Sequence, residues 1–131
     1  MSEFDSAKKS TEENMKFELM RFRVLAGKET RVQEWMEFLN ANMPAVEETL
    51  EPEQMYVESI FAEQIDGVYY LYWYSVQGDN PQSVHDSEYW LDHKHLEFWR
   101  ECIDPNYPGV KLTPKVLMLP QRVLESMKPL P

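Results

Sequence analysis

The chain of 131 residues is poor in the residue types that build many functional sites. It has four glycines, and Cys102 is its only cysteine. A lone cysteine excludes an intramolecular disulfide and a thiolate-bound metal cluster within one subunit, and it fits a reducing compartment. The sequence also contains no glycine-rich phosphate loop, nucleophile elbow or HExxH motif. Their absence argues against the common nucleotide-binding and hydrolase mechanisms.

Long apolar runs are missing as well. No stretch approaches the roughly 20 apolar residues that cross a bilayer. Residues 1–14 lack the basic start and apolar core of a secretory signal. We therefore expect a cytoplasmic protein. Residues 1–14 also lack apolar periodicity, so we expect a disordered tail followed by a single domain over residues 15–131.

Positive charge is scarce. The chain has 13 Lys and Arg residues against 23 Asp and Glu residues, which gives a formal net charge of −10. This charge repels phosphate backbones and anionic lipids, so we expect neither nucleic acid nor a membrane as a partner. Hydrophobic residues, in contrast, make up 43% of the chain and aromatic ones 13%. This content excludes disorder over the whole chain and predicts a folded domain with a real core.

Apolar periodicity divides the chain into strands and helices. It predicts strands over residues 16–25, 55–65, 68–77 and 116–119, and helices over 29–43, 44–50, 83–103 and 120–127. Asn42 is placed to cap the second helix, and Asp86 or Ser87 the third.

The dipeptide Asp66-Gly67 lies between the two strands over 55–65 and 68–77. It supplies the positive φ angles that a type I′ hairpin needs. A two-residue loop also predicts the register of the strands. The expected pairs are Ile65 with Val68, Phe61 with Tyr72, Ile60 with Trp73 and Ser59 with Tyr74.

The strand over 68–77 is apolar or aromatic on both faces. One face carries Tyr70, Tyr72, Tyr74 and Val76, and the other carries Tyr69, Leu71 and Trp73. Such a strand is covered on both sides, by the helices on one face and, we expect, by a second subunit on the other. The order of elements predicts an α+β, ferredoxin-like β-α-β-β-α-β fold with a four-stranded antiparallel sheet. We expect a homodimer formed through the sheet face.

Three segments resemble an uncharacterised bacterial family of small proteins allied to the dimeric α+β barrels. They are MKFELMRFRVLAGKETRVQEWMEFL, MYVESIFAEQIDGVYYLYWYSVQG and HKHLEFWRECIDP, and the resemblance covers roughly residues 15–127. It implies the barrel fold and the homodimer, but no substrate. The wider superfamily includes antibiotic-biosynthesis monooxygenases, haem-degrading enzymes, polyketide cyclases, sugar mutarotases and stress-responsive proteins, so the fold does not determine the function.

His95 is the first candidate for chemistry. It shares an inner helical stripe with Leu91, Phe98 and Cys102, which directs it between helix and sheet, where relatives in that superfamily often keep a ligand pocket. Histidine suits proton transfer at neutral pH. The alternative is a histidine at the edge of the core that is bonded to a carbonyl group. Haem ligation by His93 or His95 is a further possibility, but the motif of haem-degrading relatives is absent.

The remaining candidates come from the strands and the same helix. We predict His95 and Tyr72 as catalytic residues, and Trp73, Trp99, Arg21 and Arg23 as ligand-binding residues. Ion pairing at a dimer rim is the alternative for the arginines, and simple packing is the alternative for the tyrosine. Glu88, Asp92 and Glu97 have helical spacing with the histidines, but a solvated acidic face explains them better than a metal site. We expect no metal and no cofactor.

Two classes of function follow. The first is a small-molecule-binding protein or enzyme, monooxygenase-like or cyclase/isomerase-like, with a pocket between the helices and the sheet. In an enzyme, His95 would transfer a proton to or from an aromatic or keto compound that Tyr72 orients. The second is a non-catalytic dimeric interaction or stress-response protein, whose aromatic residues only build the core and the interface. RNA binding is not expected, because the strand lacks the Lys/Arg-Gly-Phe/Tyr pattern of RNA-recognition modules.

Overall fold

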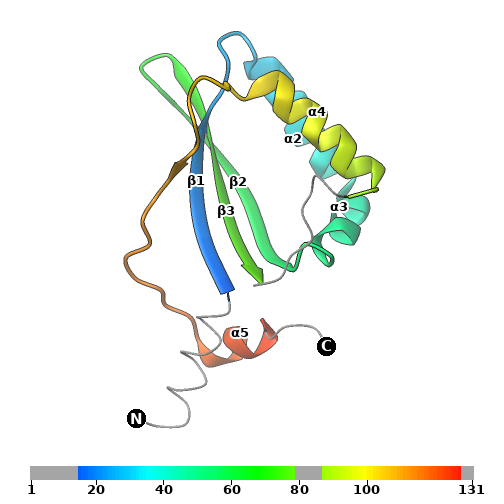
Figure 1. The fold of residues 1–131 in the computed structure, drawn as a ribbon, viewed down its shortest axis with the longest axis vertical. Helices are drawn as coiled ribbons and strands as arrows, with labels where there is room; N and C mark the ends of the chain where they lie inside the picture. Colours follow the sequence, from blue (N-terminus) through cyan, green and yellow to red (C-terminus); the bar gives the residue numbers. More distant parts are fainter. Residues whose placement is uncertain (1–14, 79–86, 128–131) are drawn as a thin grey trace.

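The structure, a computed structural model, describes residues 15–78 and 87–127. These residues form an α+β domain with one four-stranded antiparallel sheet (Figure 1). The strands are β1 (Met15–Arg23), β2 (Met55–Ile65), β3 (Val68–Gly78) and β4 (Val110–Lys111). The helices are α2 (Glu29–Ala41), α3 (Met43–Leu50), α4 (Trp90–Cys102) and α5 (Gln121–Ser126). Helices α2, α3 and α4 lie on one face of the sheet, and α5 lies at one end of the molecule (Figure 1).

The strand order in the sheet is β2-β3-β1-β4. Strand β3 lies between β1 and β2 and is antiparallel to both along nearly its full length. This confirms the antiparallel four-stranded sheet and the central place of the strand that is apolar on both faces.

The hairpin between β2 and β3 confirms the expected turn. Asp66 has a φ of 49° and Gly67 a φ of 79°, which are the two positive angles of a type I′ turn. The register is confirmed as well: the structure pairs Ile65 with Val68, Phe61 with Tyr72, Ile60 with Trp73 and Ser59 with Tyr74. A dipeptide that prescribes its own turn therefore determines which side chains of β2 and β3 share a face.

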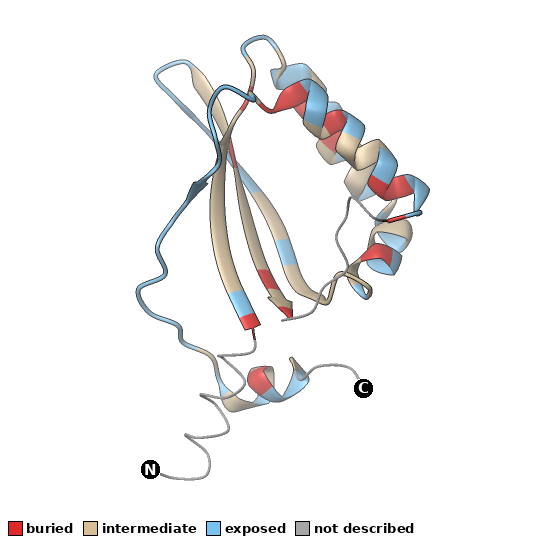
Figure 2. Ribbon diagram, in the orientation of Figure 1, coloured by how far each residue is buried: buried red, intermediate tan, exposed pale blue. Residues whose placement is uncertain are grey.

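The main core lies between the helices and the sheet. Its buried residues are Val24, Val32, Trp35, Leu71, Phe98, Cys102 and Ile103. Trp35 and Cys102 are both 0% exposed. Figure 2 shows buried positions along the sides of α2 and α4 that face the sheet. The inner helical stripe predicted for α4 is confirmed, since Leu91, Phe98 and Cys102 are buried.

A smaller core lies on the opposite face of the sheet. There the buried side chains of Met15, Val76 and Leu124 pack together, with Phe17 and Tyr74 beside them. Leu124 belongs to α5, so the C-terminal part of the chain itself covers one end of the face that the sequence assigned to a second subunit. We call this second face, with Arg21, Tyr72 and Phe61, the open face.

The bounds predicted for the third helix are wrong. The helix expected over 83–103 begins only at Trp90, because residues 87–89 are not helical; residues 83–86, including Asp86, lie outside the described residues. Tyr89 occupies the N-cap position, and the Ser87 hydroxyl accepts a hydrogen bond from the Tyr89 backbone N–H. Asn42 does stand between α2 and α3, but its amide donates to the Phe38 carbonyl instead of capping α3.

The last strand was also predicted in the wrong place. Residues 116–119 have no regular structure, and the strand is β4, six residues earlier at Val110–Lys111. Gly109 allows this early contact, because an added Cβ would come within 2.5 Å of the Phe22 ring on β1. The Leu112 N–H still donates to the Leu19 carbonyl, but Pro114 has no N–H and ends the ladder.

None of the helices in the described residues is long and apolar enough to span a membrane.

The turn supplies the first test. Replacing Gly67 by Val should destabilise the protein by about 1–3 kcal/mol, because a β-branched residue resists the positive φ. Thermal unfolding should show a lower melting temperature. The control is Asp66→Asn at the neighbouring position, which tolerates positive φ and should leave the melting temperature unchanged. An unaltered melting temperature in Gly67→Val would mean that the turn is of another type.

Candidate functional site

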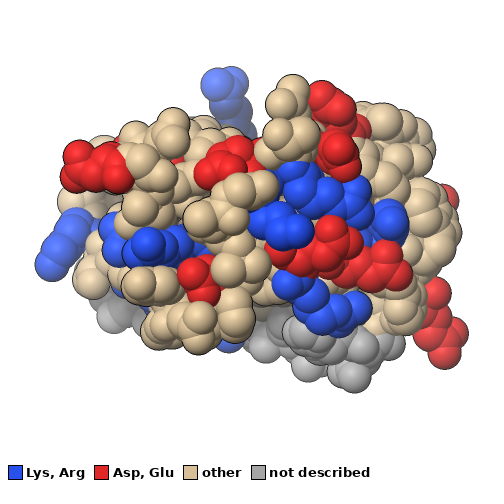
Figure 3. All heavy atoms as spheres, turned by 90° about the horizontal axis from the view of Figure 1, so that it is seen from above, with Lys and Arg blue, Asp and Glu red and all other residues tan. Residues whose placement is uncertain are grey.

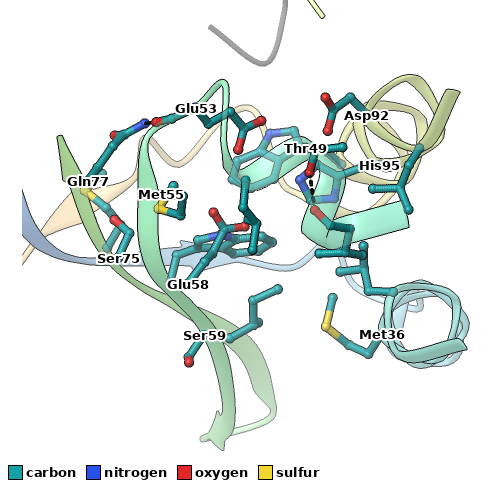
Figure 4. A pocket seen from close by; sticks show the side chains of 18 of the residues that line it. Met36, Thr49, Glu53, Met55, Glu58, Ser59, Ser75, Gln77, Asp92 and His95 are labelled. Atoms are coloured by element: carbon teal, nitrogen blue, oxygen red, sulfur yellow. Dashed lines mark hydrogen bonds between the residues drawn. The ribbon is translucent and has the colours of Figure 1, made fainter. Parts of the chain in front are cut away.

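A cavity of about 910 Å³ lies between the helices and the sheet. Its walls come from β1, β2 and β3 on one side and from α2, α3 and α4 on the other (Figure 4). The cavity is flanked by the main core, in which Trp35 and Leu71 are closely packed. The space is therefore part of the same layer as the core but is not filled by side chains of the described residues.

Apolar and aromatic side chains make up most of the wall. Four methionines line it, Met20, Met36, Met43 and Met55, together with Ile60, Leu39, Trp73 and Trp99. The rings of Trp73 and Trp99 lie with their centroids 5.3 Å apart in an edge-to-face arrangement. Methionine side chains are flexible and polarisable, so a wall rich in methionine adapts to different apolar shapes.

Four carboxyl groups interrupt this apolar wall: Glu18, Glu53, Glu58 and Asp92. They come from β1, from the loop that precedes β2, from β2 and from α4. Glu18 has a cationic partner, since the Lys111 ammonium lies 3.5 Å from its carboxylate. Figure 4 shows Glu53, Glu58 and Asp92 around one end of the cavity. We call these three residues the carboxyl cluster.

Burial raises the pKa of every member of the carboxyl cluster. The pKa of Glu53 rises to about 8, first through desolvation and then through the negative charges of Asp92 and Glu58. Desolvation also raises the pKa of Glu58, although the Trp73 indole N–H donates to its carboxylate. Glu58 as a whole residue is exposed to solvent, and it lines the cavity. For Asp92, desolvation raises the pKa against the opposing effect of a hydrogen bond with Ser87.

His95 also lines the cavity, and one nitrogen of its ring accepts a hydrogen bond from the core. The Trp35 indole N–H donates to His95 Nδ1 at 3.0 Å. Burial lowers the pKa of His95 to about 4, so the ring is neutral at physiological pH. With Nδ1 accepting from Trp35, the neutral ring carries its proton on Nε2. His95 is therefore arranged to donate a hydrogen bond rather than to accept a proton.

The structure brings together only part of the predicted site. His95, Trp73 and Trp99 all line the cavity. Tyr72, Arg21 and Arg23 point to the open face of the sheet, because neighbouring residues of a strand point to opposite sides. Tyr72 and His95 therefore do not share a site.

On the open face, the other predicted residues have partners of their own. The Tyr72 hydroxyl donates to the Glu63 carboxylate. The Arg21 guanidinium lies 5.2 Å from the centre of the Tyr70 ring, and that of Arg23 lies 4.0 Å from the Tyr107 ring. Both arginines thus stack on aromatic rings of their own chain.

The carboxyl cluster was missed by the sequence analysis. Asp92 was expected on a solvated acidic face with Glu88 and Glu97, and this is wrong, since Asp92 is 4% exposed. The other two residues are exposed as expected. A signal was present: Asp92 stands three residues before His95, on the border of the inner helical stripe. Glu53 and Glu58 gave no comparable signal, because an acidic residue in a loop or on an edge strand is ordinary.

The remaining reactive groups do not form a second site among the described residues. No group of three or more His, Cys, Asp or Glu residues is placed there to hold a metal ion. The Cys102 thiol is 0% exposed, and burial raises its pKa, which keeps it in the unreactive thiol form. His93 is exposed on the outer side of α4.

Comparison with known proteins gives one assignment. The sequence model of the family of unknown function DUF6176 matches residues 15–125. The chain therefore belongs to this family, which confirms the resemblance to an uncharacterised family. No curated protein and no solved structure matches the chain.

The raised pKa of Glu53 predicts how stability depends on pH. The folded protein holds a proton up to about pH 8 that an unfolded chain releases near the ordinary value of 4.5. Stability should therefore fall as the pH rises between these values. His95 acts oppositely, because its lowered pKa costs stability only as the pH falls from 6.5 towards 4. Between about pH 6.5 and 8, the carboxyl cluster should dominate the change of stability with pH.

The test measures melting temperature across this window. Glu53→Gln should flatten the decline, because it removes the group that must lose its proton. The control is Glu51→Gln, which removes an exposed carboxylate only two residues away and should leave the decline as it is. An equal decline in Glu53→Gln and the unmodified protein would contradict the assignment.

Proposed function

We propose that this member of the DUF6176 family binds a small, largely apolar molecule in the cavity between the helices and the sheet. The cavity itself carries this proposal. Its volume of about 910 Å³ falls within the range of roughly 300–1,000 Å³ that is typical of ligand pockets. A largely apolar wall with a few converging polar groups is also typical of such sites.

The polar groups argue against a mere packing defect. Protein interiors are close-packed, and a buried carboxyl group without a cationic partner is destabilising. Asp92 nevertheless occupies a position on α4 that is 4% exposed, and Glu53 and Glu58 come to the same place from other elements. A domain selected for stability alone would place an apolar side chain at the buried position of Asp92.

Both non-catalytic binding and proton transfer fit this cavity. For a cyclase/isomerase-like or monooxygenase-like activity on an aromatic or keto compound, Glu53 and Glu58 are better placed to exchange protons than His95. A carboxyl group whose pKa is raised to about 8, as in Glu53, both gives and takes protons near neutral pH. The basic nitrogen of His95 already accepts from Trp35, so we assign His95 the orienting of a ligand through Nε2–H.

The open face supports the second part of the proposal, a cytoplasmic homodimer in the ferredoxin-like, barrel-forming arrangement. The strand order β2-β3-β1-β4 with antiparallel neighbours is compatible with that arrangement. The open face presents Phe61, which is 59% exposed. The segment between β4 and α5 adds exposed Val116 and Met118, at 70% and 83%. A second copy would bury this apolar area. A dimeric interaction protein is the alternative function that this face favours.

The ligand proposal is tested by filling the cavity. Ile60→Trp places an indole in the space, whereas Ile65→Trp adds the same ring to the exposed end of β2, away from the cavity. Small aromatic and keto compounds would be screened by saturation-transfer NMR and titrated by tryptophan fluorescence. We expect the hits to bind at least about tenfold more weakly to Ile60→Trp and unchanged to Ile65→Trp. Hits that bind both variants alike would show that the cavity is not the site.

The dimer is tested by sedimentation equilibrium at micromolar concentration. We expect twice the chain mass of 15.6 kDa. Tyr72→Asp places a charge beside Glu63 in the middle of the open face and should give the monomer. His93→Asp, on the outer side of α4, should remain dimeric. A single 15.6 kDa species for the unmodified protein would refute the dimer and leave the cavity proposal intact.

A further inference from the structure

We infer that the ligand of this cavity carries a positively charged nitrogen, held by the carboxyl cluster of Glu53, Glu58 and Asp92. The inference rests on the proposed function and narrows it to one chemical class. That class is an apolar ammonium compound: a protonated amine or a quaternary ammonium ion with an aromatic or aliphatic body.

The first observation is the convergence of three elements at one end of an apolar cavity. Glu53 lies in the loop before β2, Glu58 on β2 and Asp92 on α4. The negative charges of Asp92 and Glu58 act on Glu53, and that of Asp92 acts on Glu58. Figure 4 shows them around the same space. Repulsion at such a place is relieved when a cation binds between the carboxylates.

The second observation is the state of Asp92. Asp92 is only 4% exposed, and its hydrogen-bond partner, the Ser87 hydroxyl, is neutral. His93, the next residue on α4, lowers the pKa of Asp92 by its charge but is itself exposed to solvent, and the effect of burial is larger. A buried carboxylate is normally paired with a cation. Among the described residues that line the cavity, none is a Lys or an Arg. A ligand that enters this cavity can supply the missing charge.

Several basic side chains elsewhere in the described residues pair with acidic ones of the same chain. Arg31 contacts Glu34 and Glu101, each at 2.7 Å. The Lys94 ammonium lies 3.3 Å from Glu97, and Lys111 pairs with Glu18. Figure 3 shows Lys and Arg side chains mixed with acidic ones on an end face of the molecule, so the positive charge there is balanced locally.

The rest of the wall fits the body of such a ligand. The faces and edges of Trp73 and Trp99 lie beside the methionines. Aromatic faces attract cations, most strongly when the cation is desolvated, and thioether side chains fit aliphatic or aromatic bodies. An anionic aromatic acid would meet the same carboxylates with repulsion. The cavity therefore favours a cationic ligand over an anionic one.

Cation binding should also displace protons from the cluster. The groups that face Glu53 are Glu58 from β2, and Asp92 and His95 from α4, with Glu18 on β1 neutralised by Lys111. A bound cation stabilises the carboxylate forms and lowers their pKa values. Binding at neutral pH should therefore release protons, and affinity should increase as the pH rises towards 8.

The experiment compares three probes that share a phenyl ring and differ in charge: 2-phenylethylammonium, 2-phenylethanol and 3-phenylpropanoate. Isothermal titration calorimetry at neutral pH, in two buffers of different ionisation enthalpy, measures both the affinity and the proton release. We expect the ammonium compound to bind at least about tenfold more tightly than the alcohol, and the carboxylate to bind most weakly.

Two neutral variants assign the effect to the cluster. Glu58→Gln and Asp92→Asn should each reduce the preference for the ammonium compound over the alcohol by about tenfold, with little effect on the alcohol itself. Glu97→Gln is the matched control, because it removes an exposed charge from the same helix. If one cavity variant fails to fold, the other still decides.

Three results would overturn the inference. If the alcohol or the carboxylate binds as tightly as the ammonium compound and Ile60→Trp still abolishes binding, the ligand site stands and the charge assignment fails. A preference for the ammonium compound that survives both cavity variants would place the cation elsewhere. Finally, no binding of any probe to the unmodified protein would count against the ligand site itself.

Discussion

The structure depends on one buried indole ring. Trp35 of α2 is 0% exposed and contacts the rings of Trp73 on the sheet, and His95 and Phe98 on α4. A buried indole N–H needs an acceptor, and here it is His95 Nδ1 at 3.0 Å. This hydrogen bond joins the two long helices above the sheet. It also fixes the proton position of His95, the one histidine among the described residues that line the cavity, so fold and site share one interaction.

Strand β3 serves two surfaces at once. Trp73 points into the cavity, whereas its neighbour Tyr72 points to the open face and donates to Glu63. The alternation of a strand separates these side chains by the thickness of the sheet. A change at one residue therefore acts on the proposed ligand site, and a change at the next acts on the surface proposed for self-association. The two properties can be altered independently.

Much of the fold could be predicted because its rules are local. Asp66-Gly67 prescribes a turn, the turn prescribes the register, and alternation then assigns each residue of β3 to a face. The site was harder to predict, because Glu53 and Asp92 meet only through the packing of α4 and the loop before β2 against the sheet. The last strand shows the same limit: Val116 suits a strand by propensity, but Gly109 and Pro114 decide where the chain contacts β1.

The edge of the sheet has a consequence for assembly. Strand β2 is the outermost strand on its side, and a β-bulge between Met55 and Val57 interrupts its regular pairing with β3. Exposed Glu63 adds charge on the same strand. Charges and bulges discourage another strand from adding to an edge, which is the step that leads to open-ended fibres. The proposed homodimer would instead use the broad face of the sheet, where a two-fold arrangement closes on itself and growth stops.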